Sequence, residues 1–148
     1  MGNAPVDKAR IRQRLREFDF NGLFIEELGW DHHRAHPLVV QAGDSTYTLQ
    51  AVAEKRGMVA YTCQADGPIP DYATRRKIET QAAKTAHEHI IIYMDAEHST
   101  QTWQWVRREL GRPAACREHT FHGTQSGEAL AQKLEELAVG LEEEESLT

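Results

Sequence analysis

The sequence feature that most constrains the fold is the apolar run Ile90-Ile91-Ile92-Tyr93-Met94. It is the most apolar stretch of the chain, and its short length and β-branched residues are typical of a strand. Side chains on a strand alternate between the two faces of a sheet, so a run that is apolar throughout has no face suited to water. The run therefore predicts a central strand that is buried on both faces.

Further short segments predict the strands that surround this centre. They are rich in Val, Tyr and Thr or alternate in polarity, and the turn sequences Ala42-Gly43-Asp44 and Lys55-Arg56-Gly57 separate the first three, which predicts a meander. The expected strands before and after the central run cover residues 38–41, 46–54, 58–64, 102–108 and 117–122.

The remaining segments predict helices. Asp7 is a candidate N-cap, and Ile11, Leu15 and Phe18 then recur on one face until Asn21-Gly22 breaks the pattern. A short helix is expected before Gly29, and a thin apolar face predicts another after Asp71. In the last helix, which begins at Ser126, four leucines share one stripe. The expected helices cover residues 7–18, 23–28, 72–86 and 126–141, and residues 30–37 are expected to form a polar, His-rich loop.

Length and composition indicate one domain. The chain has 148 residues, of which 40% are hydrophobic, enough for a continuous core over residues 1–148. We predict an α+β fold with a central mixed sheet of about six strands flanked by helices. No apolar run approaches the length of a membrane span or signal-peptide core, so we expect a cytoplasmic protein without a membrane partner. Cys63 and Cys116 have no second Cys nearby, so neither a disulfide framework nor a zinc ribbon is indicated.

The net charge of -6 argues against a nucleic-acid partner, but the positive charges are grouped. Four of the acids lie in the closing run Glu142-Glu143-Glu144-Glu145, which is typical of a solvated helix end. Local basic surfaces can therefore exist despite the negative total. The basic groups are Lys8, Arg10, Arg12, Arg14 and Arg16, then Arg75-Arg76-Lys77, and then Arg107, Arg108, Arg112 and Arg117.

Several stretches together resemble the N-terminal region of large fused restriction–modification polypeptides, in which an adenine-specific DNA methylase and a target-recognition region follow. The stretches are residues 24–31, 52–57, 103–109 and 125–127, with the acidic run 141–145. The resemblance implies further domains of the same polypeptide beyond Thr148, since the methylase motif Asn-Pro-Pro-Tyr and a glycine-rich cofactor loop are absent here. It also implies a front domain that cleaves DNA and is similar to the PD-(D/E)xK nucleases.

The first six expected elements resemble the αβββαβ core of the restriction-endonuclease-like fold. A magnesium-dependent endonuclease of this kind would use Asp44 and Glu54 as metal ligands, with Lys55 or Arg56 stabilising the attacking water and the phosphate. Lys55 is adjacent to Glu54, whereas a Glu-x-Lys pair needs residues two apart to share a face, which leaves Arg56 or a bulge to supply the geometry. The alternative is that residues 54–57 form a charged hairpin turn and no cofactor is bound.

Aromatic residues and arginines alternate near the C-terminal end of the expected sheet. Trp105, Arg107, Arg108, Arg112 and Arg117 are the candidate DNA-binding residues, since aromatic rings can stack on bases and arginines can hold phosphates. Trp103 and Trp105 would share one face of a strand. The alternative is that both tryptophans pack under the last helix while the arginines face water.

The histidines do not follow a recognised metal-binding spacing, so we expect no structural zinc site. The sequence thus predicts a DNA-contacting N-terminal module of a restriction–modification or phage-defence protein, either a magnesium-dependent nuclease or a binding domain. A third possibility is a non-catalytic domain that docks a methylase body through the helix carrying Leu130 and Leu141.

Overall fold

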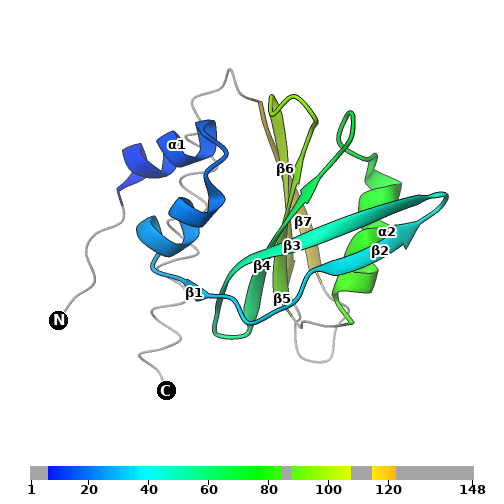
Figure 1. The fold of residues 1–148 in the computed structure, drawn as a ribbon, viewed down its shortest axis with the longest axis horizontal. Helices are drawn as coiled ribbons and strands as arrows, with labels where there is room; N and C mark the ends of the chain where they lie inside the picture. The colour runs from blue at the N-terminus through cyan, green and yellow to red at the C-terminus, as the bar shows by residue number, and fades with distance from the viewer. Residues whose placement is uncertain (1–6, 85–87, 108–114, 123–148) are drawn as a thin grey trace.

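The computed structural model of the chain describes residues 7–84, 88–107 and 115–122 (Figure 1). The expected helix over residues 126–141 lies outside these ranges. The elements in chain order are α1 (Lys8–Arg16), the π-helical turn η1 (Gly22–Glu27), β1 (Asp31–His32), β2 (Leu38–Ala42), β3 (Ser45–Lys55), β4 (Met58–Gln64), α2 (Tyr72–Ala82), β5 (Glu88–Met94), β6 (Thr100–Arg107) and β7 (Ala115–His122).

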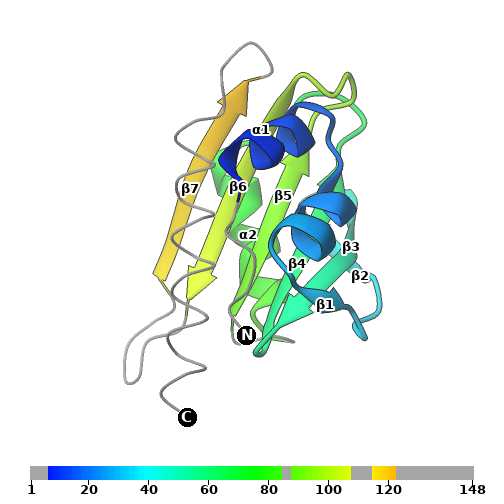
Figure 2. The ribbon, with the colours of Figure 1, turned by 90° about the vertical axis from the view of Figure 1, so that its left-hand side faces the viewer.

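The described strands form one open mixed sheet in the order β1-β3-β4-β5-β6-β7, and β2 pairs with β3 beside β1. β4 and β5 are parallel, with α2 in the connection between them, and the other pairs are antiparallel. α1 and η1 pack on one face of the sheet and α2 packs on the other (Figures 1 and 2). The prediction of an α+β fold with a central mixed sheet flanked by helices is confirmed.

The predicted central strand is β5, which is buried on both faces. Ile90 and Ile92 face the cluster beneath α1 and η1, whereas Ile91 and Tyr93 face the cluster beneath α2. All four side chains have no exposed surface. An apolar run without alternation therefore formed a strand covered by helices on each side, as its pattern requires.

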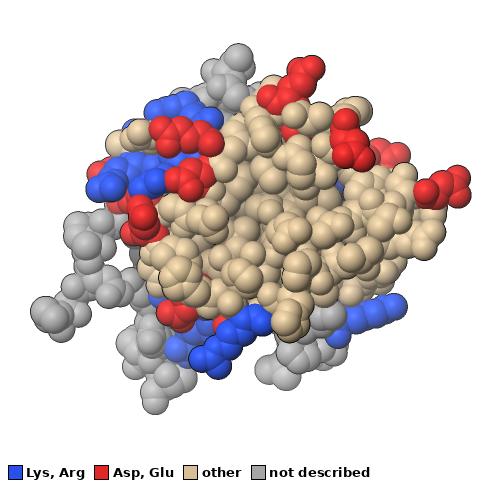
Figure 3. All heavy atoms as spheres, in the orientation of Figure 1, with Lys and Arg blue, Asp and Glu red and all other residues tan. Residues whose placement is uncertain are grey.

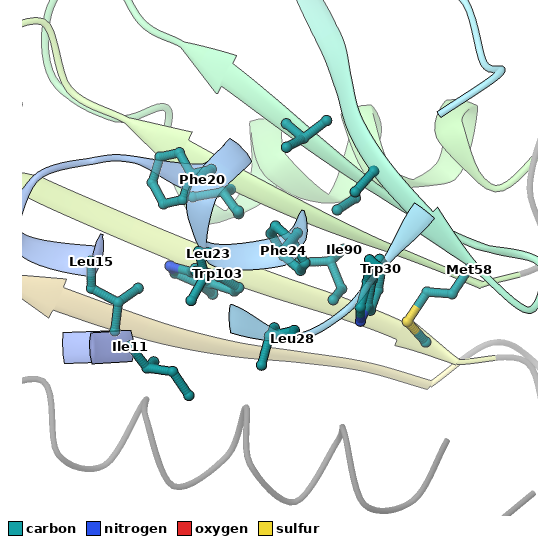
Figure 4. Packing of buried hydrophobic residues seen from close by; sticks show 14 of the residues in the cluster. Ile11, Leu15, Phe20, Leu23, Phe24, Leu28, Trp30, Met58, Ile90 and Trp103 are labelled. Atoms are coloured by element: carbon teal, nitrogen blue, oxygen red, sulfur yellow. The ribbon is translucent and has the colours of Figure 1, made fainter. Parts of the chain in front are cut away.

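Trp103 of β6 is the largest side chain in the core beneath η1 (Figure 4). Its ring lies 6.0 Å from that of Phe20 and 5.9 Å from that of Phe24. Phe24 in turn meets Trp30 at 4.8 Å. Aromatic pairs at these distances contribute beyond the area that they bury, so this cluster holds η1 and the segment after it on the sheet.

A buried polar link joins α1 to the same strand. The side-chain amide of Gln101, which is fully buried, donates to the carbonyl oxygen of Leu15 at 2.6 Å. The indole Nε1 of Trp103 donates to Oε1 of Gln101 at 2.9 Å. The end of α1 thus gains a partner from a strand far along the chain, and Trp103 gains one for its buried N–H.

Several elements differ from the sequence prediction. α1 ends at Arg16, and Phe18 adopts a left-handed φ of 55° where the chain turns toward η1. β1 lies inside the segment expected to be a loop, since two residues paired with β3 leave no pattern to recognise. β3 carries a bulge between Ala51 and Ala53, and α2 ends at Ala82. In the described ranges, no helix has both the length and the apolar character needed to cross a membrane.

We predict that Gln101→Leu destabilises the fold by about 2–4 kcal/mol. The leucine side chain has nearly the same volume, but the buried Leu15 carbonyl and Trp103 N–H lose their hydrogen-bond partner. Urea unfolding followed by tryptophan fluorescence measures this change. The matched control is Gln13→Ala, which removes an exposed side-chain bond to Glu17 and should cost less than about 0.5 kcal/mol. Equal stability of the two variants would show that the link does not hold α1.

Candidate binding site

The structure does not bring Asp44 and Glu54 together. Asp44 lies in the turn before β3, and Glu54 lies next to the end of that strand. At about 3.3 Å per residue, ten residues of strand separate them by roughly 30 Å, whereas ligands of one magnesium ion lie within about 2 Å of it. Lys55 ends β3 and Arg56 follows in the turn with a left-handed φ of 51°. The four residues of the nuclease hypothesis therefore do not form one site.

The cross-strand partner of Glu54 is Asp31 of β1, a pairing that the sequence did not suggest. Two carboxylates alone leave a metal ion short of protein ligands. Across the part of the chain that the structure describes, no three His, Cys, Asp or Glu side chains gather in an arrangement that could hold a metal ion.

The aromatic and arginine segment divides between core and surface. Trp103 is fully buried, and Trp105 is half-buried and stacks on it at 5.6 Å. Arg117 is the cross-strand partner of Trp105, and Arg107 is that of Ala115. Arg108 and Arg112 lie outside the described residues. Trp103 packs beneath η1 beside Phe24. The last helix, under which both tryptophans were alternatively expected to pack, lies outside the described residues.

Two basic residues of α1, Arg10 and Arg14, are paired with carboxylates of the same chain. Arg14 donates to the carboxylates of Asp19, Glu26 and Glu27, at 2.6 Å for Glu26 and 3.1 Å for Glu27. The hydrogen bond with Asp19 is the main cause that raises the pKa of Arg14. Arg10 pairs with Glu27 at 3.2 Å. These pairs compete with any phosphate for the same guanidinium groups.

The basic group on α2 is engaged in the same way. Arg75 forms a two-pronged pair with Glu118 of β7 at 2.8 and 2.9 Å, which is the main cause that raises the pKa of Arg75. Arg76 pairs with Glu79 at 3.2 Å. Glu79 is itself buried, and this burial raises its pKa. Arg75 thus ties α2 to β7, whereas the pair of Arg76 and Glu79 lies within α2.

A polar chain continues from Glu118 through the sheet. Gln104 of β6 donates to Glu118 at 3.2 Å, and the hydroxyl of Tyr93 donates to Gln104 at 2.9 Å. Arg75 also donates to the carbonyl of Pro70 at 2.6 Å. Because each member has a partner, the chain fits a structural role that ties β5, β6 and β7 to α2.

His89 of β5 has no exposed surface, and both of its ring nitrogens lack a hydrogen-bond partner. Burial favours the neutral ring and lowers its pKa to about 4. Among the described residues, no acid, base or nucleophile forms a hydrogen bond with the His89 ring, so we interpret His89 as a core residue and not as a catalytic one.

The open part of the sheet surface carries no charged side chain on β2 and the first half of β3. The exposed residues there are Val39, Gln41, Thr46, Thr48 and Gln50, and Val39 is 70% exposed. Gln50 pairs with Thr62 of β4. Thr62 shares a face of the strand with Met58 and Ala60, and those two residues pack beneath α1 and η1. Figure 3 shows this broad uncharged surface, with acidic atoms along its upper and right margins and basic atoms along its lower margin.

A groove of about 470 Å³ lies beside this surface, between the first residues of β3 and the segment after β4. Thr46, Thr48 and Gln64 line it together with Asp66 and Pro68. A second hollow of about 520 Å³ is lined by Phe18, Thr62, Met94 and His98, with the rings of Phe18 and His98 5.0 Å apart. Both lie near the carboxyl ends of the parallel strands β4 and β5, where open sheets commonly bind ligands.

The chain was compared with models of known protein families, with curated proteins and with solved structures, and none of these comparisons gives a match.

We predict that acid weakens the fold through His89. Its pKa is about 4 in the folded chain and about 6.5 when unfolded, so the unfolded state binds the extra proton between these values. The free energy of unfolding is therefore unaffected by His89 protonation above about pH 6.5, and it declines by about 3 kcal/mol as the pH falls to 4. Urea unfolding across this range should show a flatter profile for His89→Leu.

The carboxylates do not account for a loss of stability between pH 6.5 and 4. Asp19 and Asp95 have a lowered pKa, so the stability that they supply is lost only below pH 3.8. The raised pKa of Glu79 makes the fold more stable as the pH falls. A wild-type profile that matches that of His89→Leu between pH 6.5 and 4 would contradict the prediction.

Proposed function

We propose that this chain is a non-catalytic docking module of a restriction–modification system, which binds a methylase body through the uncharged face of β2 and β3. The observation that supports this function best is the open sheet surface of Val39, Gln41, Thr46, Thr48 and Gln50. The centres of protein interfaces are depleted of charged residues, so a partner protein suits this surface. The methylase partner rests on the sequence resemblance.

The distribution of charge also favours a protein partner over DNA at this face. Phosphate binding draws on free Lys and Arg side chains. Arg14 and Arg75, which belong to the two basic groups of the first half of the chain, are held by carboxylates. The separation of Asp44 and Glu54 along β3 gives the magnesium-dependent nuclease no support.

We predict that Thr48→Arg weakens binding of a separately produced adenine-specific methylase body by about tenfold or more, because it places an unpaired charge in the proposed interface. Titration calorimetry at moderate salt measures the affinity. Ala73→Arg adds the same charge at an exposed position of α2 and should bind as wild type does. Failure of the wild-type chain to bind the methylase body, or equal affinities of the two variants, would overturn the proposal.

DNA contact by β6 and β7 is a second candidate function. The observation that favours it is the register of these strands, which pairs the half-exposed Trp105 with Arg117 across the ladder. An aromatic ring beside an arginine can stack a base while the arginine meets a phosphate.

For this second candidate, we expect weak DNA binding with a steep salt dependence. An Arg107→Ala/Arg117→Ala double variant should lose affinity similarly for all duplex sequences, because phosphate contacts carry no base information. The slope of log affinity against log salt should fall by about two. Fluorescence anisotropy across a salt series measures both, and an unchanged slope in the double variant would exclude these strands.

A further inference from the structure

The hairpin of β2 and β3 extends beyond the end of β4, and this extension creates the groove. β3 pairs with β4 as far as Leu49, opposite Cys63, whereas its pairing with β2 continues to Ser45. The bulge at Val52 follows Leu49 closely along β3 and, like other bulges, bends the strand. Figure 1 shows the β2–β3 hairpin reaching past the end of β4. The first residues of β3 therefore have β2 on one side and the groove on the other.

The hydrogen-bond pattern of the hairpin decides which backbone groups meet the groove. Ala42 and Ser45 flank a two-residue turn in which Gly43 has a φ of 65°, so they form a hydrogen-bonded pair. Bonded and non-bonded pairs alternate along an antiparallel ladder, so Thr46 and Thr48 direct their N–H groups away from β2. In the described part of the chain, no backbone bond to either N–H appears beyond the strand ladders.

The outer edge of the hairpin is covered, in contrast to this inner edge. Gln41 directs its carbonyl away from β3, and the side chain of Gln81 on α2 donates to that oxygen at 2.9 Å. On the inner side, the segment across the groove contains Pro68 and Pro70, which have no N–H to donate. The neighbouring segment does not pair with β3 as a strand, and its two prolines cannot donate to the carbonyls of β3.

The charges around the groove indicate the sign of its occupant. Asp66 lines it, and Asp44 lies at the tip of the hairpin. The adjoining hollow adds Asp95 and Glu97. No Lys or Arg is among the described residues that line the groove. A segment with lysine or arginine side chains complements this rim, whereas a nucleic-acid strand would meet repulsion.

We propose that the groove binds an extended, basic peptide segment of a partner protein by strand addition to β3. Backbone pairing with the N–H groups of Thr46 and Thr48 supplies affinity, and the acidic rim selects basic side chains. The segment takes the position that β4 would occupy if it continued past Gln64. This inference rests on the proposed docking function and names the partner chemistry at the same surface.

The test uses a labelled peptide of alternating valine and lysine and the whole chain. Fluorescence anisotropy should show binding, and Thr48→Pro should weaken it by about tenfold, because proline removes the N–H that faces the groove. Thr48→Pro should still fold, since that N–H does not join the β2 ladder. Tyr47→Pro is the contrasting variant, because the N–H of Tyr47 pairs with β2, and it should be destabilised.

Two further measurements keep the result decisive if Thr48→Pro fails to fold. A backbone N-methylated form of the peptide should lose binding to the wild-type chain, and the amide protons of Thr46 and Thr48 should become protected from exchange when the unmodified peptide binds. The matching peptide of valine and glutamate should not bind, since the rim repels it.

Each outcome bears on the proposal. Absence of binding by the lysine peptide overturns it, and so does binding that ignores both Thr48→Pro and N-methylation, which indicates adsorption to the acidic rim. The docking function is tested separately. If Thr48→Arg weakens binding of the methylase body but Thr48→Pro does not, the body uses the uncharged face without strand addition, and the strand-addition proposal is wrong.

Discussion

The arrangement of the molecule depends on how Trp103 and Gln101 hold the first helical segment against the sheet. Trp103 supplies the apolar surface against which Phe20 and Phe24 pack, and Gln101 fixes the end of α1 through the Leu15 carbonyl. Both side chains come from β6, so the N-terminal segment is placed by a strand that follows it by most of the chain. This placement determines which part of the sheet face is covered and which part stays open.

The parts of the fold that could be predicted from the sequence are those with a strong local pattern. Ile90 to Met94 required burial on both faces. Asp7 was predicted as the N-cap of α1, and a helix was expected after Asp71, which caps α2 in the structure. The π-helical form of η1 and the pairing of β1 depend on distant partners. A bridge of two residues has no periodicity of its own, so no sequence pattern could have revealed it.

The candidate site was harder to predict than the fold, for a geometric reason. Asp44 and Glu54 flank one expected strand, and their separation follows only once the full length of β3 is known. Thr46, Thr48 and Gln50 alternate as they would on any solvent-facing strand. Whether they line a binding site depends on where α1 stops covering the sheet and on where β4 ends, and the sequence of β3 shows neither.

The pairing of Gln81 with the carbonyl of Gln41 has a consequence for self-association. An exposed hairpin edge is a template on which copies of the same chain can stack, and such stacking is a route to aggregation. Here the side chain of an α2 residue occupies the outer edge, and the inner edge is short and bordered by aspartates. Two identical molecules bring like charges together at that edge, so the chain can keep a strand-accepting surface while resisting polymerisation with itself.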